Sequence, residues 1–200
     1  MDPDDLEWRF SRMNEGLSFL LAVLSLGIGY IVRYITSPLL LILLILTTAI
    51  AIVPHEVAHR QVARMNGCNS RFVLSFTGFI VTFFINLVMG LIGFGPIIFI
   101  SGYTSSSCRF FSLSKDLEGK IALAGPLINI IIAILSIILL RFTTGITSIF
   151  LILLVTFNSF VAFFNLLPLG QLDGYKIFRW NVVIWSIMFI ISIVLIIRIF

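Results

Sequence analysis

Five consecutive residues, His55-Glu56-Val57-Ala58-His59, place two imidazoles and a carboxylate directly after the apolar run Leu39–Val53. A helix sets residues four apart on one face, so both histidines can reach a single ion. Glu56 projects about 100° around the helix from His55 and can act on a water beside that ion. Because ionisable groups are costly to bury in hydrocarbon, an apolar helix that contains them indicates a functional site. The spacing is typical of a zinc hydrolase.

A third ligand must come from elsewhere in the chain, since catalytic zinc usually takes three protein ligands and leaves one position for water. The motif contains both histidines of the chain, so the third ligand is a carboxylate or a thiolate. Two candidates, Asp116 and Glu118, belong to the polar loop Ser105–Lys120, where a solvated surface is the simpler interpretation.

Asp173 is the better candidate for the third ligand. It comes shortly after Pro168 and Gly170, at the end of an apolar segment. Neither residue continues a regular helix comfortably, so the chain can unwind there and turn a carboxylate inward. The alternative for Asp173 is a turn residue that ends a helix.

The composition requires a membrane. The 200 residues are 60% hydrophobic and only 11% charged, and the mean hydropathy is +1.15. A soluble domain needs a larger polar surface than this. The net charge of +4 does not indicate a nucleic-acid partner, because no basic run is interleaved with aromatic residues. We expect an integral, multi-pass protein whose surroundings are the lipid bilayer.

At about 20 residues per span, we predict an all-α polytopic fold with about six hydrophobic segments. Residues 1–16 are acid-rich and predict an interfacial N-terminal segment, and residues 17–200 a single domain with its core at about 39–174. The segments are Leu17–Ile35, Leu39 to about Gln61, Phe72–Ile100, Ile121–Leu140, Ile146–Leu167 and Val182–Phe200.

The segment Phe72–Ile100 is too long for one span and too short for two. If it crosses once, the 13 basic residues divide seven to six between the two sides; if it enters and returns, they divide ten to three. The positive-inside rule favours the second arrangement, with the N-terminus and the opening of the site on the cytoplasmic side. The segment is therefore predicted to be a re-entrant hairpin with a short β element.

The hairpin has a geometric consequence for the site. It returns Asp173 to the same side of the membrane as His59, whereas a single crossing would separate them by roughly 30 Å. The return segment Pro96–Tyr103 has strand character and is our candidate for an edge that holds an unwound substrate. Cys68 and Cys108 are too few for a disulfide framework, and we expect two free thiols.

Three motifs in this order resemble the site-2 protease family of intramembrane zinc metalloproteases. They are the HEVAH motif, the sequence Ala124-Gly125-Pro126-Leu127-Ile128-Asn129, and the sequence from Asn165 to Gly174 that ends in Leu172-Asp173-Gly174. The resemblance covers roughly residues 39–174. Pro54 departs from a regular helix immediately before the motif and should kink it.

The resemblance implies regulated hydrolysis of a peptide bond within or near a transmembrane segment of a protein substrate. It implies one zinc ion bound by His55, His59 and Asp173, with Glu56 as the general base. Asn165 resembles the residue proposed to contact substrate or the developing oxyanion, and Asn129 lies near the site. The oligomeric state stays open, as does the choice among divalent metals.

Alternative interpretations exist for the two asparagines and for the function. Asn165 could simply satisfy broken backbone near Pro168, and Asn129 could form a structural bond between helices. Asn86 and Asn158 are interpreted as packing residues. A non-catalytic metal-binding membrane scaffold is the alternative function, although it would not need a base such as Glu56. A metal transporter would need a second site or an acidic pathway, and the sequence offers neither.

Overall fold

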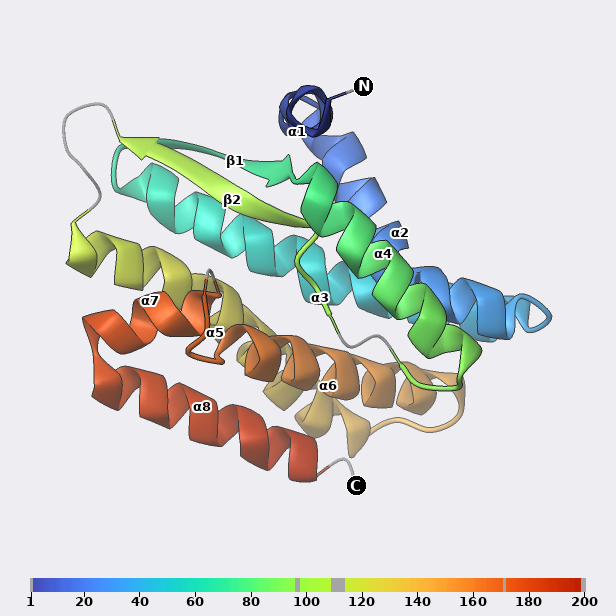
Figure 1. The fold of residues 1–200 in the computed structure, drawn as a ribbon. Helices are drawn as coiled ribbons and strands as arrows, with labels where there is room; N and C mark the ends of the chain where they lie inside the picture. The colour runs from blue at the N-terminus through green and yellow to red at the C-terminus, as the bar shows by residue number, and fades with distance from the viewer. Residues whose placement is uncertain (1, 96–97, 109–113, 171, 199–200) are drawn as a thin grey trace. The chain divides into compact units, whose positions relative to one another are not determined.

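The computed structural model describes residues 2–95, 98–108, 114–170 and 172–198 (Figure 1). The chain forms two compact units, which are described separately: unit 1 is Met1–Ala49 with Arg71–Ser105, and unit 2 is Ile50–Ser70 with Ser106–Phe200. The predicted boundary between an interfacial segment, residues 1–16, and a single domain, residues 17–200, stays a prediction.

Four helices are long and apolar enough to cross a membrane: α2 (Glu15–Tyr34), α3 (Pro38–Met65), α5 (Lys115–Leu140) and α6 (Ile146–Asn165). Two shorter apolar helices, α4 (Phe76–Leu91) and α8 (Val182–Ile197), accompany them. The expected fold class, a mainly helical polytopic membrane protein with a small β element, is confirmed. Each expected segment contains one of these helices, and most boundaries agree within a few residues.

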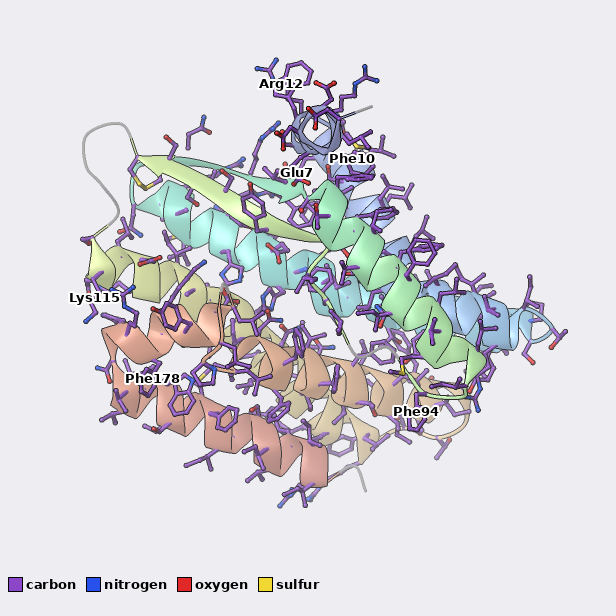
Figure 2. All side chains as sticks on the ribbon, viewed as in Figure 1. Glu7, Phe10, Arg12, Phe94, Lys115 and Phe178 are labelled. Atoms are coloured by element: carbon purple, nitrogen blue, oxygen red, sulfur yellow. A yellow bond between two sulfur atoms is a disulfide. The ribbon has the colours of Figure 1, made fainter. Side chains whose placement is uncertain are left out.

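In unit 1, the short helix α1 (Pro3–Ser11) is held against the start of α4. The Glu7 carboxylate accepts a hydrogen bond of 3.1 Å from the backbone N–H of Thr77, in the first turn of α4. The rings of Phe10 and Phe76 meet edge to face with their centroids 5.0 Å apart, and Figure 2 labels Glu7 and Phe10 on this side of α1. A negative charge is favourable at a helix N-terminus, so Glu7 both docks α1 and caps α4.

Helices α2 and α4 of unit 1 cross at two glycines. A Cβ added to Gly29 would lie 2.6 Å from the Asn86 carbonyl oxygen and 3.1 Å from the Gly90 Cα. A Cβ added to Gly90 would overlap the Gly29 Cα. Small residues are used in this way where membrane helices approach backbone to backbone.

After α4, the chain returns along that helix without forming a strand at once. The Asn86 side-chain N–H donates to the Ile98 carbonyl at 2.8 Å, and the Ile100 N–H donates to the Thr82 hydroxyl at 3.1 Å. Strand β2 begins only at Gly102 and ends at Cys108. The prediction of a strand from Pro96 was therefore wrong for residues 98–101, because side chains of α4 take the backbone groups there. Residues 96 and 97 lie outside the described residues.

Strands β1 (Cys68–Leu74) and β2 form a two-stranded sheet, and a disulfide joins Cys68 to Cys108. The expectation of two free thiols was wrong. The pairing of the two strands brings the Cα atoms of these cysteines to 4.1 Å, although 40 residues separate them in sequence. Counting cysteines could not show this proximity, which depends on how the intervening chain folds back.

In unit 2, α5 packs against α6 and against the short helix α7 (Asp173–Trp180), and α8 packs against α6 (Figure 1). The Trp185 indole donates to the Leu166 carbonyl, just beyond the end of α6, at 2.8 Å. The buried hydrophobic core of this part is Ala122, Ile130, Ala133, Ala162, Leu166, Ile177, Met188 and Leu195. These contacts fix the turn between α6 and α7, which carries Asp173.

The glycine crossing generates a first prediction. Gly90→Ala should destabilise the protein by about 1–3 kcal/mol, because the new methyl group meets backbone that cannot move without separating α2 from α4. The measurement is the midpoint of thermal unfolding in detergent. Val88→Ala, at an exposed position of the same helix, serves as the control and should shift the midpoint much less. Equal midpoints for wild type and Gly90→Ala would contradict the close crossing.

Candidate metal centre

Helix α3 carries the HEVAH motif and continues through Pro54 to Met65. Because Pro54 has no N–H, the Ile50 carbonyl one turn earlier lacks its usual helical partner. His55 and His59 lie on one side of the helix, with ring centroids 4.7 Å apart. Both are buried, as is Glu56, at 1%, 5% and 5% exposure respectively. The expected placement of both imidazoles on one face is confirmed.

The chain turns sharply between α6 and α7 and brings Asp173 to the histidines. Helix α6 ends at Asn165, Gly170 adopts a positive φ of 54°, and Gly174 lies so close to the Leu166 carbonyl that a Cβ would not fit. Asp173 Oδ2 lies 3.2 Å from His55 Nε2 and 3.1 Å from His59 Nε2. The structure thus brings together the two histidines and the one acid that the sequence favoured.

One ligand atom from each of these three residues lies within 4.8 Å of the others, a group that could hold a metal ion. Two imidazole nitrogens and a carboxylate oxygen are a donor set that suits zinc. Three protein ligands leave a position for water or substrate, as in catalytic rather than structural zinc sites.

The second nitrogen of each imidazole already has an acceptor. His55 Nδ1 lies 2.5 Å from the Asn129 side-chain oxygen, and His59 Nδ1 lies 2.6 Å from the Ile121 carbonyl oxygen. Oxygens of this kind only accept hydrogen bonds, so each Nδ1 carries the hydrogen. With its hydrogen on Nδ1, each imidazole can offer its Nε2 lone pair to a metal ion held between it and Asp173. Metal-binding histidines are usually oriented in this way.

Gly125 of α5 leaves room for this arrangement. A Cβ at this position would lie 2.5 Å from His55 Nε2 and would also overlap His59 Nε2. The two atoms it would meet are therefore the nitrogens that face the candidate ion. Any larger residue would push the imidazoles away from Asp173.

The two asparagines predicted near the site occupy different settings. Asn129 is fully buried, accepts from His55, and donates to the Ala51 carbonyl at 2.8 Å. Asn165 is the last residue of α6, and its amide donates to the Val161 carbonyl at 3.0 Å. All of these bonds are to groups of the protein itself, and the substrate-binding roles of both residues remain predictions.

The sequence analysis did not identify three groups that support the metal centre. They are Gly125, which leaves room for the two imidazoles, the Ile121 carbonyl, which accepts from His59, and Asn158, which accepts from Asn129. The signal for Asn158 was present, since an asparagine in the middle of an apolar span needs a polar partner. The Ile121 carbonyl had no signal, because every residue carries one.

The glycine contact predicts that Gly125→Ala will remove bound zinc. The protein purified with zinc should retain less than about a tenth of the wild-type metal content, since the methyl group displaces both Nε2 atoms. Gly119→Ala is the matched control: it makes the same change on the same helix, but its Cβ meets the Trp180 side chain instead. The control should keep its zinc, and full zinc content in Gly125→Ala would contradict this geometry.

Comparisons with known proteins agree with the geometry. No protein-family model matches the chain, and no solved structure matches it either. A protein of Methanocaldococcus jannaschii named "Putative zinc metalloprotease MJ0611" is 34% identical over 186 residues, which are 90% of this chain and 91% of that protein. Identity at this level over nearly the whole of both chains shows common descent. The chain therefore belongs to the zinc metalloprotease family of this M. jannaschii protein.

Proposed function

We propose that this protein is an intramembrane zinc metalloprotease that cuts a peptide bond within or near a transmembrane segment of another protein. The observation that carries the proposal is the convergence of His55 Nε2, His59 Nε2 and Asp173 Oδ2, with both Nδ1 atoms held by acceptors. The helix that carries the histidines is apolar and long enough to span a membrane. We infer that a protease site on such a helix acts on substrates in the bilayer. The resemblance to site-2 proteases supports the same assignment.

Each residue of the centre has a role in the proposal. His55, His59 and Asp173 hold one zinc ion. When bound, zinc polarises the scissile carbonyl and makes a water more acidic. Glu56 accepts the proton of the attacking water and passes it to the leaving amine. The hydrogen bonds that His55 and His59 donate from Nδ1, to Asn129 and to the Ile121 carbonyl, hold the imidazoles in position.

The substrate must be unwound before it can be cut, because a peptide bond inside a helix is shielded by its own backbone hydrogen bonds. An extended segment can be held by pairing with a strand edge, and we propose β2, one of the two strands of the β1–β2 sheet, for this role. Asn165 is proposed to donate to the substrate or the developing oxyanion with the second hydrogen of its NH₂ group, while the first stays bonded to the Val161 carbonyl.

The proposed mechanism predicts the behaviour of Glu56→Gln. This variant should bind about one zinc ion per chain, as the wild type does, since Glu56 is not among the three proposed ligands. Its cleavage of helical membrane-protein substrates in detergent should fall by about 10²–10⁴-fold, because the base is lost. Zinc content and cleavage are measured on the same preparations, with phenanthroline as the control for metal dependence.

Asp173→Asn completes this experiment, because it should lose zinc and activity together. Stoichiometric zinc in the wild type with no cleavage of any substrate would contradict the protease and favour the scaffold. Absence of zinc from every preparation would overturn the metal centre itself.

We propose a cytoplasmic N-terminus from the ten-to-three distribution of basic residues. The disulfide bears on this orientation, because the start of α2 and the second half of β1 lie together in unit 1: Glu15 accepts from the Phe72 N–H at 2.9 Å. Cys68 begins the same strand, so it shares the N-terminal side. Disulfides persist in oxidising compartments and are rare in the cytosol. In the proposed orientation, the reducing cytosol would therefore open the Cys68–Cys108 bond that the structure contains.

This orientation predicts that both cysteines are free thiols in the cell. Cells are quenched with acid, and the denatured protein is treated with a maleimide–polyethylene glycol before any reductant is added, so that only free thiols are labelled. Two labels per chain are expected, and a Cys68→Ser/Cys108→Ser variant should take none. A chain that labels only after reduction would place this end in an oxidising compartment and reverse the proposed orientation.

A further inference from the structure

A fully buried asparagine of α6, Asn158, is linked to the metal centre without touching it. Its Oδ1 accepts a hydrogen bond of 2.8 Å from Asn129 Nδ2, and its own Nδ2 donates to the Leu154 carbonyl at 2.9 Å. Asn129 in turn accepts from His55. A continuous line of hydrogen bonds therefore runs from the backbone of α6 to a proposed zinc ligand of α3.

The orientation of the Asn129 amide follows from its neighbours. Both hydrogens of Nδ2 have acceptors, the Ala51 carbonyl at 2.8 Å and Asn158 Oδ1 at 2.8 Å. A rotation of the amide by 180° would place Asn129 Oδ1 against these two oxygens, and three buried acceptors would face one another without a hydrogen. The Asn129 oxygen therefore points toward His55.

The orientation of Asn158 is fixed in the same manner. Leu154 lies one helical turn earlier, and its backbone carbonyl can only accept, so it selects the NH₂ group of Asn158. The oxygen of Asn158 is then left for Asn129. Two backbone carbonyls, at Ala51 and Leu154, set the direction of every hydrogen bond in the line.

We propose that Asn158 is a positioning residue for the metal centre: it orients Asn129 so that His55 keeps its hydrogen on Nδ1 and offers the Nε2 lone pair to zinc. With Asn129 reversed, its NH₂ group would face His55 Nδ1, the imidazole hydrogen would move to Nε2, and the lone pair would be lost from the metal side. This inference rests on the proposed function, in which His55 is a zinc ligand.

The test is the zinc dissociation constant of the full-length protein in detergent, measured by competition with a chelator. Asn158→Leu removes the acceptor and should weaken zinc binding at least about tenfold, as loss of outer hydrogen bonds to metal ligands does. Asn158→Asp, as the protonated acid, keeps both an oxygen that accepts from Asn129 and a hydrogen for the Leu154 carbonyl, so its dissociation constant should stay within about threefold of the wild type. Asn158→Ala replaces the Leu variant in this comparison if that variant does not fold.

A double-mutant cycle separates positioning from general packing. If Asn158 acts through Asn129, adding Asn158→Leu to Asn129→Leu should not weaken zinc binding further, whereas independent packing defects add. Asn86→Leu is the matched control, because Asn86 is an equally buried asparagine that bonds to the backbone of Ile98 in unit 1. It should leave the zinc dissociation constant unchanged.

The outcomes distinguish this inference from the proposed function. Wild-type affinity in Asn158→Leu, equal losses in the Leu and Asp variants, or additive losses in the double mutant would each overturn the role of Asn158 and leave the metal centre standing. A wild type that binds no zinc would overturn the proposed function, and the role of Asn158 with it.

Discussion

Two imidazoles and a carboxylate are buried beside one another among apolar helices, and much of unit 2 is arranged around keeping them in place. Water cannot solvate buried polar groups, so each needs a partner within the protein. The Nδ1 atoms of His55 and His59 find carbonyl oxygens, and both Nε2 atoms face Asp173. Helix α6 must end where it does, because a continuous helix would carry Asp173 past the histidines. The turn between α6 and α7 is therefore needed both to give the buried histidines a polar partner and to complete the proposed metal site.

The parts of this arrangement that follow from periodicity could be predicted from the sequence. The i, i+4 spacing places His55 and His59 on one face whatever surrounds them. The proximity of Asp173 was predicted from the chain break after Pro168 and Gly170 and from the count of basic residues, which favours an even number of crossings between Arg71 and Lys120. The four long apolar helices were predictable from their composition, although α3 extends to Met65 and α5 begins at Lys115, both in polar sequence beyond the predicted segments.

The parts that depend on which atoms meet in space could not be predicted. Gly125 has the same sequence character as any helical glycine, and only its position against two Nε2 atoms gives it a role. The extent of β2 depends on whether Asn86 and Thr82 take the backbone of residues 98–101 or leave it free to pair. Asn158 looked like a packing residue because its partner, Asn129, had itself no assigned contact. In each case the missing information was a distance between residues far apart in the chain.

The Cys68–Cys108 bond has a topological meaning that neither charge nor hydropathy supplies. A bond between these sulfurs closes a covalent ring that contains all of α4. A chain that passes through the bilayer an odd number of times leaves its two ends on opposite faces, and no bond of ordinary length could close such a ring. A closed ring therefore fits only a segment that begins and ends on one face, which is the arrangement that the distribution of basic residues favours. In the orientation proposed above the ring is open in the cell, and wherever the bond does form it holds the two ends of this segment together.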